Sequence, residues 1–599
     1  MAPFPLNTDA TDDPYEKFEM EHADQLVAAA IPPKYWSTIY KKLVNETFDA
    51  GSYFQILAEE TGEGTHYSVV ALKDIDVEDP NSIFLIDHAW TFRPQIARQH
   101  LREIPGLLER VSAVFDIDLE PQESDMPIWY MPDEFGVRIG HSDEPNFRML
   151  PMFYHAQHAA YSLLFPLKKV NAGEVITRDY VDTPIMRSNP NWRSILLHPW
   201  IPINLANEKV GLVLGTDELF TVLVFLVFIN LVFADTLPAK DFKMTLSVVP
   251  PGIVRVFADD YQFIDRMKEV KVEKVDRMED ADVIWWRGHF HDYKLLSERN
   301  PNAFVNQFPD EAVLTVKDLL AASIQAAYSN ETMRWPPRWF ETTFNLKNAL
   351  PQFVTYFQQR QLRGLDNTWI VKPWNLARGL DMHVTNNLSY IIRLVESGPK
   401  IACKYIHRPL LFMRPDNGNL VKFDLRYIIL VTSLKPLKLM IYNNFWIRFA
   451  INEFDLHELD DRETHFTVFN YDYKSKILQM RCEDFIASIE KQYTTLKWSE
   501  IQLRINKVIA EVLTAVSSGE APRSIMPDPQ SRAMYGVDIM LKWDSDDVST
   551  RNLEVSFIEA NFMPDCERAC DYYENFADSA FNALFMGKVD PKEFTELIS

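Results

Sequence analysis

Two apolar stretches near the C-terminal end carry isolated polar residues, and they restrict the fold more than any other feature of the sequence. MYGVDIMLKW contains Asp538, and VSFIEANFMPDCE contains Glu559 and Asn561. Side chains two residues apart on a strand share a face, so Glu559 and Asn561 project together from an otherwise apolar strand. Carboxylate and amide oxygens suit Mg²⁺. We therefore expect two neighbouring strands that carry a metal site, although a strand with two outward polar residues would look similar.

An upstream string, WIVKP, ends close to Lys372 and is followed by a loop that contains Arg378 and Gly379. A lysine at the end of a strand can reach phosphate oxygens as a point charge, and the loop can lie over them. Lysine before proline at a strand end is also common on protein surfaces. The string alone is therefore weak evidence for a phosphate site.

A third string, KFDLR, places Lys422, Asp424 and Arg426 on one face of a strand. It lies in a basic region, because residues 371–450 contain twelve Lys and Arg against four Asp and Glu, whereas the whole chain has a formal charge of -24. A basic region in an acidic protein favours an anionic ligand such as a nucleotide or an acidic peptide. Chance unevenness of charge, or a solvated strand face, would give the same pattern.

Composition restricts the class of protein. The 599 residues are 47% hydrophobic and 24% charged, as expected for a globular chain of about three or four folding units. The net negative charge argues against direct binding to nucleic acid or to an anionic membrane. Four cysteines indicate a reducing compartment. The N-terminal string MAPFPLNTDATDD has no basic segment followed by an apolar one, so we expect no signal peptide.

One apolar run, Leu219–Ala234, allows three interpretations. Its 16 residues carry no charge, but they are fewer than the roughly 18–20 that a membrane-spanning helix needs. Acidic residues flank the run, whereas basic flanks are typical of membrane segments. A buried strand pair or helix, a membrane helix and a splicing artefact all stay open, with the membrane helix disfavoured.

Hydrophobic periodicity predicts mixed α and β structure. We expect a helix over Pro94–Phe115, short strands in 120–205, and a βα-type unit with its helix over Asp260–Val270. The last unit, from about residue 340, is expected to hold a mostly antiparallel sheet. Its expected strands and helices are Trp369–Lys372, Asn386–Val395, Ile401–Tyr405, Tyr427–Thr432, Lys438–Tyr442, Glu483–Gln492 and Trp498–Val516.

Together and in this order, the strings WIVKP, KFDLR, MYGVDIMLKW and FIEAN resemble the tubulin–tyrosine ligase family. The resemblance implies an ATP-grasp fold that joins an amino acid to an acidic peptide tail through an acylphosphate, with ATP and Mg²⁺ as cofactors. It implies tubulin, or another acidic-tailed protein, as the partner. It also implies a cytoplasmic, cytoskeleton-associated protein, with the nucleus as a second compartment.

The resemblance also assigns roles to residues. The nucleotide-binding residues would be Lys372, Arg378, Gly379, Lys404, Tyr405, Ile406, Lys422 and Asp424. The metal ligands would be Asp538, Glu559 and Asn561, the catalytic residues Arg426 and Glu559, and the reader of a substrate carboxylate Arg448. Metal ions and cations would neutralise the transferring phosphoryl group, and catalysis would consist mostly of positioning.

Three departures from the family pattern affect the expected activity. Asp381 stands where active members carry a second glycine after Arg-Gly, Cys403 where they carry Gln, and Val468 where they carry Asn. A carboxylate and a Cβ near the phosphates would disfavour an anion and stiffen the loop. We therefore expect weakened nucleotide binding and little or no ligation.

The strings NSIFLIDHAW and GEVITRDY resemble a branch of the family in which a SET-like region precedes the ligase-like domain. A segment that would hold S-adenosylmethionine is not visible, so we expect a structural role for Tyr180 rather than methyl transfer. The expected fold is mixed α+β, with a β-rich SET-like domain followed by an ATP-grasp domain. The expected domains are 1–205 (SET-like with N-terminal helices), 206–243 (linker), 244–340 (first α/β part of the ligase-like domain) and 341–599 (ATP-grasp).

Three functions remain in order of preference. The first is a regulator that binds ATP, Mg²⁺ and acidic tubulin tails, and that influences tubulin or histone modification without much ligation. The second is an active ATP-dependent amino-acid ligase on tubulin tails. The third, a protein methyltransferase, is nearly excluded by the missing cofactor segment.

Overall fold

The computed structural model describes residues 13–62, 64–92, 112–114, 128–207, 235–328, 336–373, 381–468, 477–520, 523–562, 564 and 566–598. The chain forms two compact units. The first contains Met1–Leu205 and Asn387–Gly398, and the second contains Ala206–Asn386 and Pro399–Ser599. The apolar run 219–234, Arg378 and Gly379 lie outside the described residues. The domain boundaries predicted from the sequence stay predictions.

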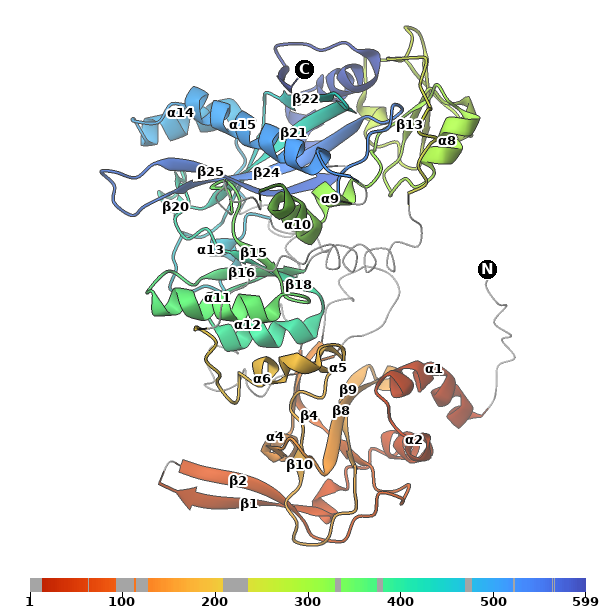
Figure 1. Ribbon diagram of the computed structural model, residues 1–599, viewed down its shortest axis with the longest axis vertical. Coiled ribbons are helices and arrows are strands. Elements are labelled where there is room, and N and C mark those ends of the chain that lie inside the picture. The colour runs from red at the N-terminus through yellow and green to blue at the C-terminus, as the bar shows by residue number, and fades with distance from the viewer. Residues whose placement is uncertain are drawn as a thin grey trace. The chain divides into compact units, whose positions relative to one another are not determined.

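The first unit is rich in short strands. Two three-stranded sheets, β3-β9-β8 and β4-β6-β5, accompany the β1-β2 hairpin and the β7-β10 pair. Helix α1 contacts β8, and it begins at Pro14 with the Asp13 carboxylate accepting a hydrogen bond from the Tyr15 N–H (Figure 1). The elements are α1 Pro14–Ala28, α2 Trp36–Val44, β1 Phe54–Thr61, β2 Gly64–Ala71, β3 Phe84–Ile86, β4 His88–Phe92, β5 Ser112–Val114, β6 Ile128–Pro132, α4 Glu134–Arg138, β7 Gly140–His141, β8 Phe147–Tyr154, β9 Ala159–Pro166, β10 Thr177–Arg178, α5 Pro184–Ser188, α6 Arg193–Leu196 and α12 Leu388–Leu394.

The helix predicted over Pro94–Phe115 is wrong at its C-terminal end. Ser112–Val114 forms β5, which pairs antiparallel with Ile128–Tyr130 of β6. Pairing with a strand some fifteen residues away supplies backbone hydrogen bonds that local periodicity does not reveal. Residues 94–111 lie outside the described residues.

The second unit begins with a parallel sheet of order β12-β11-β13-β14. Its strands are β11 Val254–Ala258, β12 Val272–Lys274, β13 Val283–Trp285 and β14 Phe304–Val305. The helix predicted over Asp260–Val270 is wrong, because only Ile264–Arg266 forms a 3₁₀ turn. The Asp578 carboxylate accepts hydrogen bonds from the backbone N–H groups of Lys268, Glu269 and Val270, at 2.8–2.9 Å. The carboxylate of a residue distant in sequence thus accepts hydrogen bonds from backbone N–H groups that would otherwise bond within a helix.

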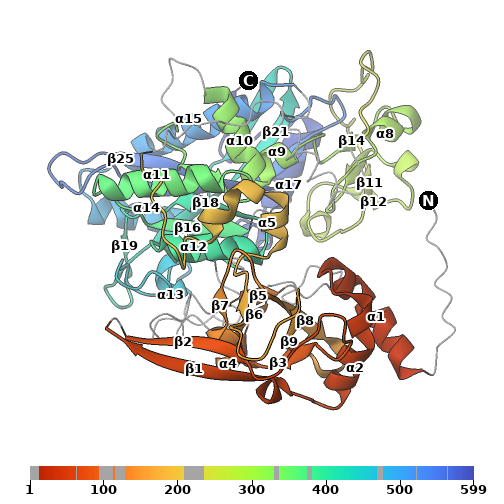
Figure 2. The same cartoon turned by 60° about the horizontal axis from the view of Figure 1, so that its bottom comes forward.

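An antiparallel sheet of order β15-β18-β16-β17 follows, with helix α11 against it (Figure 2). The Phe353 ring of α11 lies 5.0 Å from the Trp369 ring of β16, in an edge-to-face arrangement. The elements here are α8 Tyr293–Arg299, α9 Ala312–Thr315, α10 Lys317–Tyr328, β15 Thr343–Asn345, α11 Leu350–Leu362, β16 Trp369–Pro373, β17 His383–Thr385 and β18 Lys400–Lys404.

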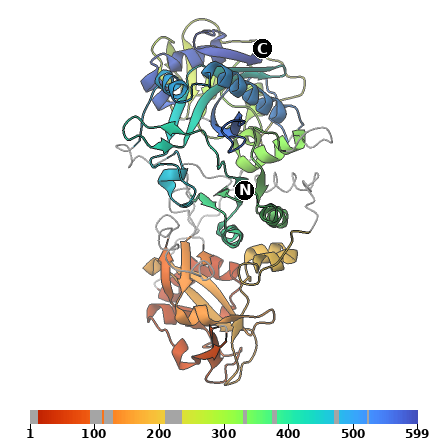
Figure 3. The ribbon, with the colours of Figure 1, turned by 90° about the vertical axis from the view of Figure 1, so that its left-hand side faces the viewer.

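The largest sheet has the order β25-β24-β21-β22-β26, with β23 paired to β21. Helix α15 covers one face, and its blue ribbon runs along the sheet in profile (Figure 3). The elements are β19 Phe412–Met413, β20 Leu420–Val421, β21 Phe423–Leu434, β22 Leu437–Tyr442, β23 Trp446–Phe449, α13 Arg462–His465, α14 Cys482–Gln492, α15 Trp498–Ser517, β24 Ala533–Trp543, β25 Leu553–Phe562, α16 Glu567–Tyr572, α17 Phe576–Phe581 and β26 Phe594–Ile598.

Alternation along β21 separates the two faces of this sheet. Leu425, Tyr427 and Ile429 join the hydrophobic core that contains α15, whereas Ile428 and Leu430 join a second core on the opposite face. The polar residues at the start of β21 continue this second face. Among the helices that the structure describes, none combines the length and apolar character needed to cross a membrane.

Candidate functional site

Charged side chains form a row across four strands of the large sheet. Arg426 on β21 is directly opposite Asp538 on β24, and Asp538 is opposite Glu559 on β25. On β23, Arg448 is opposite Asp424 of β21. Residues directly opposite each other share a face, so strand register alone gathers these five predicted residues.

Asp538 is held by two arginines. Both Nε and Nη2 of Arg426 contact its carboxylate, Nη2 at 2.9 Å, and the Arg448 Nη2 lies 2.7 Å from its Oδ2. Burial alone would raise the pKa of Asp538, but the two guanidinium groups lower it to about 2. A metal ion at Asp538 must therefore compete with two cations.

Arg448, the predicted reader of a substrate carboxylate, is occupied by carboxylates of the protein itself. Its Nε and Nη2 donate to the two Asp424 oxygens at 2.6 and 2.7 Å. The Thr467 hydroxyl donates to the same Asp424 carboxylate at 2.7 Å. Such a bidentate, charge-assisted arrangement fixes the guanidinium plane. A substrate carboxylate would have to displace Asp424 or Asp538.

Glu559 and Asn561 complete the predicted metal set. The Asn561 amide lies 3.4 Å from Glu559 Oε1, and Lys317 Nζ lies 3.6 Å from Glu559 Oε2. Two carboxylates and an amide oxygen on adjacent strands are the hard donors that Mg²⁺ prefers, so the residue set fits this ion. When bound, Mg²⁺ would be held by Asp538, Glu559 and Asn561 and would neutralise charge on phosphate oxygens.

A pocket lies next to this row of charges. Five predicted nucleotide-binding residues line it: Lys372, Lys404, Tyr405, Ile406 and Lys422. Its apolar walls can accept a planar base, and its lysines can accept an anion. The other lining residues are Lys317, Leu320, Phe340, Glu341, Thr343, Ile370, Ile401, Cys403, Met540, Phe557 and Ile558.

Lys422 is buried in this pocket, and no carboxylate of the described residues forms an ion pair with it. Its Nζ donates to the Tyr405 hydroxyl at 3.0 Å and to the His465 carbonyl oxygen at 3.2 Å. Burial lowers the pKa of Lys422 to about 7. A phosphate that entered the pocket would favour the charged form of Lys422, so its binding would be accompanied by proton uptake.

The ammonium group of Lys404 already binds other groups of the protein. Its Nζ pairs with the Asp366 carboxylate and donates to the Thr368 carbonyl oxygen at 2.7 Å. Burial lowers the pKa of Lys404, and Asp366 opposes this effect. Lys404 therefore fixes the C-terminal end of β18 to the Asp366–Thr368 segment rather than offering an uncommitted charge.

Asp381 has the left-handed backbone conformation that glycine adopts easily, with φ of 47°. Its carboxylate is buried, accepts a hydrogen bond from the His383 ring at 2.8 Å and pairs with the ammonium group of Lys400. Burial would raise the pKa of Asp381, but His383 and Lys400 lower it to about 2. Because this ion pairing compensates the charge, the predicted repulsion of phosphate is weaker than the sequence suggested.

Comparisons with known proteins identify relatives of this chain. The Tubulin-tyrosine ligase family model matches residues 295–596, and the Tubulin tyrosine ligase SET-like domain model matches residues 58–125 and 120–204. The chain is 41% identical to Tubulin--tyrosine ligase-like protein 12 of Caenorhabditis elegans, over 99% of this chain and 100% of that protein. The chain belongs to the tubulin–tyrosine ligase family. It is also 38% identical to Tubulin--tyrosine ligase-like protein 12 of Homo sapiens, over 95% of this chain and 94% of that protein.

Membership of this family confirms the resemblance and the mixed fold with SET-like and ligase-like domains. More distant members also match: Tubulin glycylase 3E of Tetrahymena thermophila is 24% identical over 55% of this chain and 23% of that protein. The tubulin–tyrosine ligase family is one of ATP-dependent amino-acid ligases.

Two pocket residues of this family member were not predicted. Lys317 opens α10 and faces Glu559, and Glu341 pairs with Lys542 while accepting a hydrogen bond from Ser556 at 2.8 Å. Neither lies in a string with a distinctive spacing. Only tertiary structure brings them to the pocket.

Tyr180 of the SET-like domain behaves as a structural residue. Its hydroxyl donates to the Ile139 carbonyl oxygen at 3.1 Å, and its ring lies 5.1 Å from those of His141 and Trp200. Burial raises the pKa of Tyr180. A phenol engaged in this way supports the predicted structural role.

Proposed function

We propose that this family member binds ATP·Mg²⁺ and an acidic tubulin tail, and that it regulates tubulin modification with little or no ligation of its own. The observation that carries the proposal is the junction of a lysine-lined pocket with the Asp538, Glu559 and Asn561 donors. Such a junction can neutralise a nucleotide triphosphate and its metal together.

Two features support weak ligation. Arg448, which the family resemblance assigns to a substrate carboxylate, is engaged through its Nε and Nη2 by Asp424 and Asp538. Asp381 is fixed by His383 and Lys400 directly after the segment expected to lie over the phosphates. Phosphoryl transfer is catalysed mostly by positioning. Side chains that already bind other groups of the protein are therefore expected to lower the rate of ligation.

The alternative, an active amino-acid ligase, is favoured by one observation. Asp538 and Glu559 occupy directly opposite positions of neighbouring strands, and Asn561 follows on the same face. A metal set that is complete in residue type is compatible with turnover once the nucleotide draws the arginines away from Asp538.

Nucleotide binding is tested by thermal unfolding of the full chain with ATP and Mg²⁺. At a hundredfold excess of ligand over Kd, binding should stabilise the protein by about 2.7 kcal/mol. Lys372→Met should abolish most of this stabilisation, because it removes a cation from the pocket. Lys438→Met, which changes an exposed lysine of the same unit, is the matched control. Absence of stabilisation in the unmodified protein would refute the nucleotide site.

Ligation is tested separately with purified tubulin and labelled Tyr, Glu or Gly. We expect incorporation at background level, whereas an active ligase of the family labels the same tubulin. Incorporation that disappears in Glu559→Gln would establish the active ligase and overturn the regulator.

A further inference from the structure

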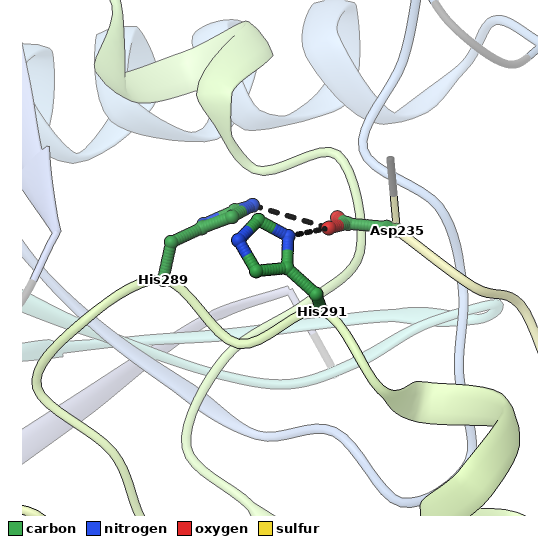
Figure 4. Close-up of side chains that lie close together, drawn as sticks. All are labelled: Asp235, His289 and His291. Carbon is green, nitrogen blue, oxygen red and sulfur yellow. Dashed lines mark hydrogen bonds and ion pairs between the residues drawn. The ribbon is translucent and has the colours of Figure 1, made fainter. Parts of the chain in front are cut away.

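A second cluster of ligand-type side chains lies outside the nucleotide pocket. The His289 Nε2 lies 3.1 Å from Asp235 Oδ1, and the His291 Nδ1 lies 3.0 Å from the same oxygen (Figure 4). One atom from each residue lies within 4.8 Å of the other two. Both imidazoles therefore converge on one carboxylate oxygen.

The local sequence explains why both histidines point the same way. They belong to the segment between β13 and α8, which is neither helix nor strand, and they flank Phe290, which is 6% exposed and packs with Tyr293 at 5.0 Å between ring centroids. In an extended chain, alternate side chains share a side. Burial of Phe290 in the core thus places His289 and His291 together on the opposite side.

The segment that carries the histidines is fixed by a buried amide. Gln307, which is 1% exposed, donates from Nε2 to the carbonyl oxygens of Trp286 and Gly288 at 2.8 and 2.5 Å. Its Oε1 accepts from the Phe290 N–H at 2.9 Å. These bonds hold the backbone on both sides of His289 and reduce the entropy cost of bringing ligands together.

The Asp235 side is fixed in a similar way. The Asp310 N–H donates to Asp235 Oδ2 at 2.8 Å, which leaves Oδ1 directed at the histidines. Thr236 bonds the His291 carbonyl oxygen through its N–H at 2.9 Å and its hydroxyl at 3.0 Å. Hydrogen bonds that orient ligand groups from behind are typical of metal sites.

Several carboxylates surround the cluster, and they favour binding of a cation. Asp235, Asp310 and Glu311 lie together, and in the described part of the chain no Lys or Arg forms an ion pair with any of them, so that His289 and His291 are the ion-pair partners of Asp235. Glu311 is 2% exposed, and its Oε1 has no hydrogen-bond partner, while its Oε2 accepts from Tyr535 at 2.8 Å. Buried carboxylates without a cationic partner are costly.

The spacing fits a tetrahedral metal. With metal–ligand bonds of about 2.0–2.2 Å, neighbouring ligand atoms around Zn²⁺ lie about 3.3–3.5 Å apart. The two nitrogen–oxygen distances are 3.1 and 3.0 Å, so a small outward movement of the side chains would admit the ion. Two imidazoles and one carboxylate suit Zn²⁺ and leave the fourth position for water.

We propose that Asp235, His289 and His291 bind one Zn²⁺ ion, which links the chain at Asp235 to the segment between β13 and α8. The ligand donors are neutral imidazole nitrogens and a carboxylate oxygen. None of these residues lines the nucleotide pocket, so the two sites share no residue. Its role is to stabilise the α/β part of the ligase-like domain.

The first test is calorimetric titration of Zn²⁺ into the chelator-treated full chain. We expect about one ion per chain, with the affinity lowered by roughly 10- to 100-fold in His289→Ala, His291→Ala and the nearly isosteric Asp235→Asn. His457→Ala is the matched control, because this histidine is 93% exposed. Equal affinity in all four variants and the unmodified chain would overturn the site.

Cobalt supplies a second readout that needs no variant. Co²⁺ bound to the unmodified chain should show the visible absorption of a tetrahedral nitrogen and oxygen site, and Zn²⁺ should displace it. Thiolate-to-cobalt charge-transfer bands would instead assign the metal to the free cysteines and refute the proposal. If neither Zn²⁺ nor Co²⁺ binds at one ion per chain, the proposal is refuted and the three residues form only a hydrogen-bonded network.

Discussion

At the scale of single residues, Asp381 shows how a substitution in a loop can be supported by its surroundings. An aspartate with φ of 47° carries backbone strain that glycine would avoid. Its carboxylate, however, is the ion-pair partner of Lys400, which is 1% exposed. Removing a partner from a buried charge costs more than the strain that glycine relieves.

Asp381→Gly is therefore expected to destabilise the second unit. Loss of the buried pair should cost about 3–5 kcal/mol, and relief of strain should return about 1 kcal/mol. Glu46→Gly is the matched control, because Glu46 has φ of 50° but is exposed, and it should be neutral or slightly stabilising. Calorimetric unfolding measures both. Equal effects of the two variants would contradict the ion-pair argument, and adding Lys400→Met to Asp381→Gly should restore most of the loss.

Residue type and spacing indicated strands that carry Lys372, Lys422, Asp538 and Glu559, whereas the resemblance to the family predicted that these residues form one site. They could not predict Lys317, which reaches Glu559 from a helix more than two hundred residues upstream. They also could not predict that the Arg448 guanidinium is already bound by Asp424 and Asp538. Partner choice among charged groups depends on tertiary distances that no local pattern contains.

At the scale of elements, the long helices and most strands predicted in the second unit match the observed ranges closely, but β21, Phe423–Leu434, extends well beyond the predicted Tyr427–Thr432. Helix α15, Trp498–Ser517, was predicted as Trp498–Val516, because a buried stripe repeats along it. The Asp260–Val270 helix failed because Asp578 binds the backbone donors of that segment. Local preference decides an element only when no distant side chain competes for its hydrogen bonds.

Strand β24 contains a glycine that makes room for the site. A Cβ at Gly536 would lie 2.9 Å from the Pro564 Cβ and 3.2 and 3.3 Å from Cδ and Nη1 of Arg426. The arginine that holds Asp538 thus crosses the strand where a side chain is absent. Close approach of a side chain to backbone is a common reason for glycine inside a strand.

Gly536→Ala should displace Arg426 and Pro564 and cost about 1–3 kcal/mol through overpacking. Gly140→Ala is the control, because Gly140 also lies in a strand but has no heavy atom within 4 Å of the added Cβ. That variant should stay within about 0.5 kcal/mol of the unmodified protein. Thermal unfolding compares the two variants. An unchanged unfolding midpoint for Gly536→Ala would show that Arg426 and Pro564 move aside without loss of stability and would contradict the prediction.

At the scale of the whole molecule, the two compact units do not correspond to two uninterrupted stretches of chain. Asn387–Gly398, which holds α12, belongs to the first unit although it lies far beyond Leu205 in the sequence. Helix α12 contacts α6, and the Arg393 guanidinium lies 4.7 Å from the centre of the Trp200 ring. A cation–π contact of this kind contributes about 0.5–2 kcal/mol.

A fragment that ends at residue 205 should therefore be less stable than the same fragment fused through a flexible linker to residues 387–398. A gain of about 2 kcal/mol corresponds to roughly 4–8 °C in Tm for a domain of this size. A fusion that carries Arg393→Ala should lose part of the gain. Identical Tm values with and without the added segment would show that residues 1–205 are sufficient.

Because Asn387–Gly398 belongs to the first unit, the two parts of the gene that encode this unit are expected to evolve together. Recombination that exchanged only the first 205 codons would separate Trp200 from Arg393, because the arginine is encoded in the other half. The recipient would receive a SET-like domain without one of its helices. The two halves are therefore expected to be inherited as a matched pair, and compensating substitutions should connect them across nearly two hundred intervening codons.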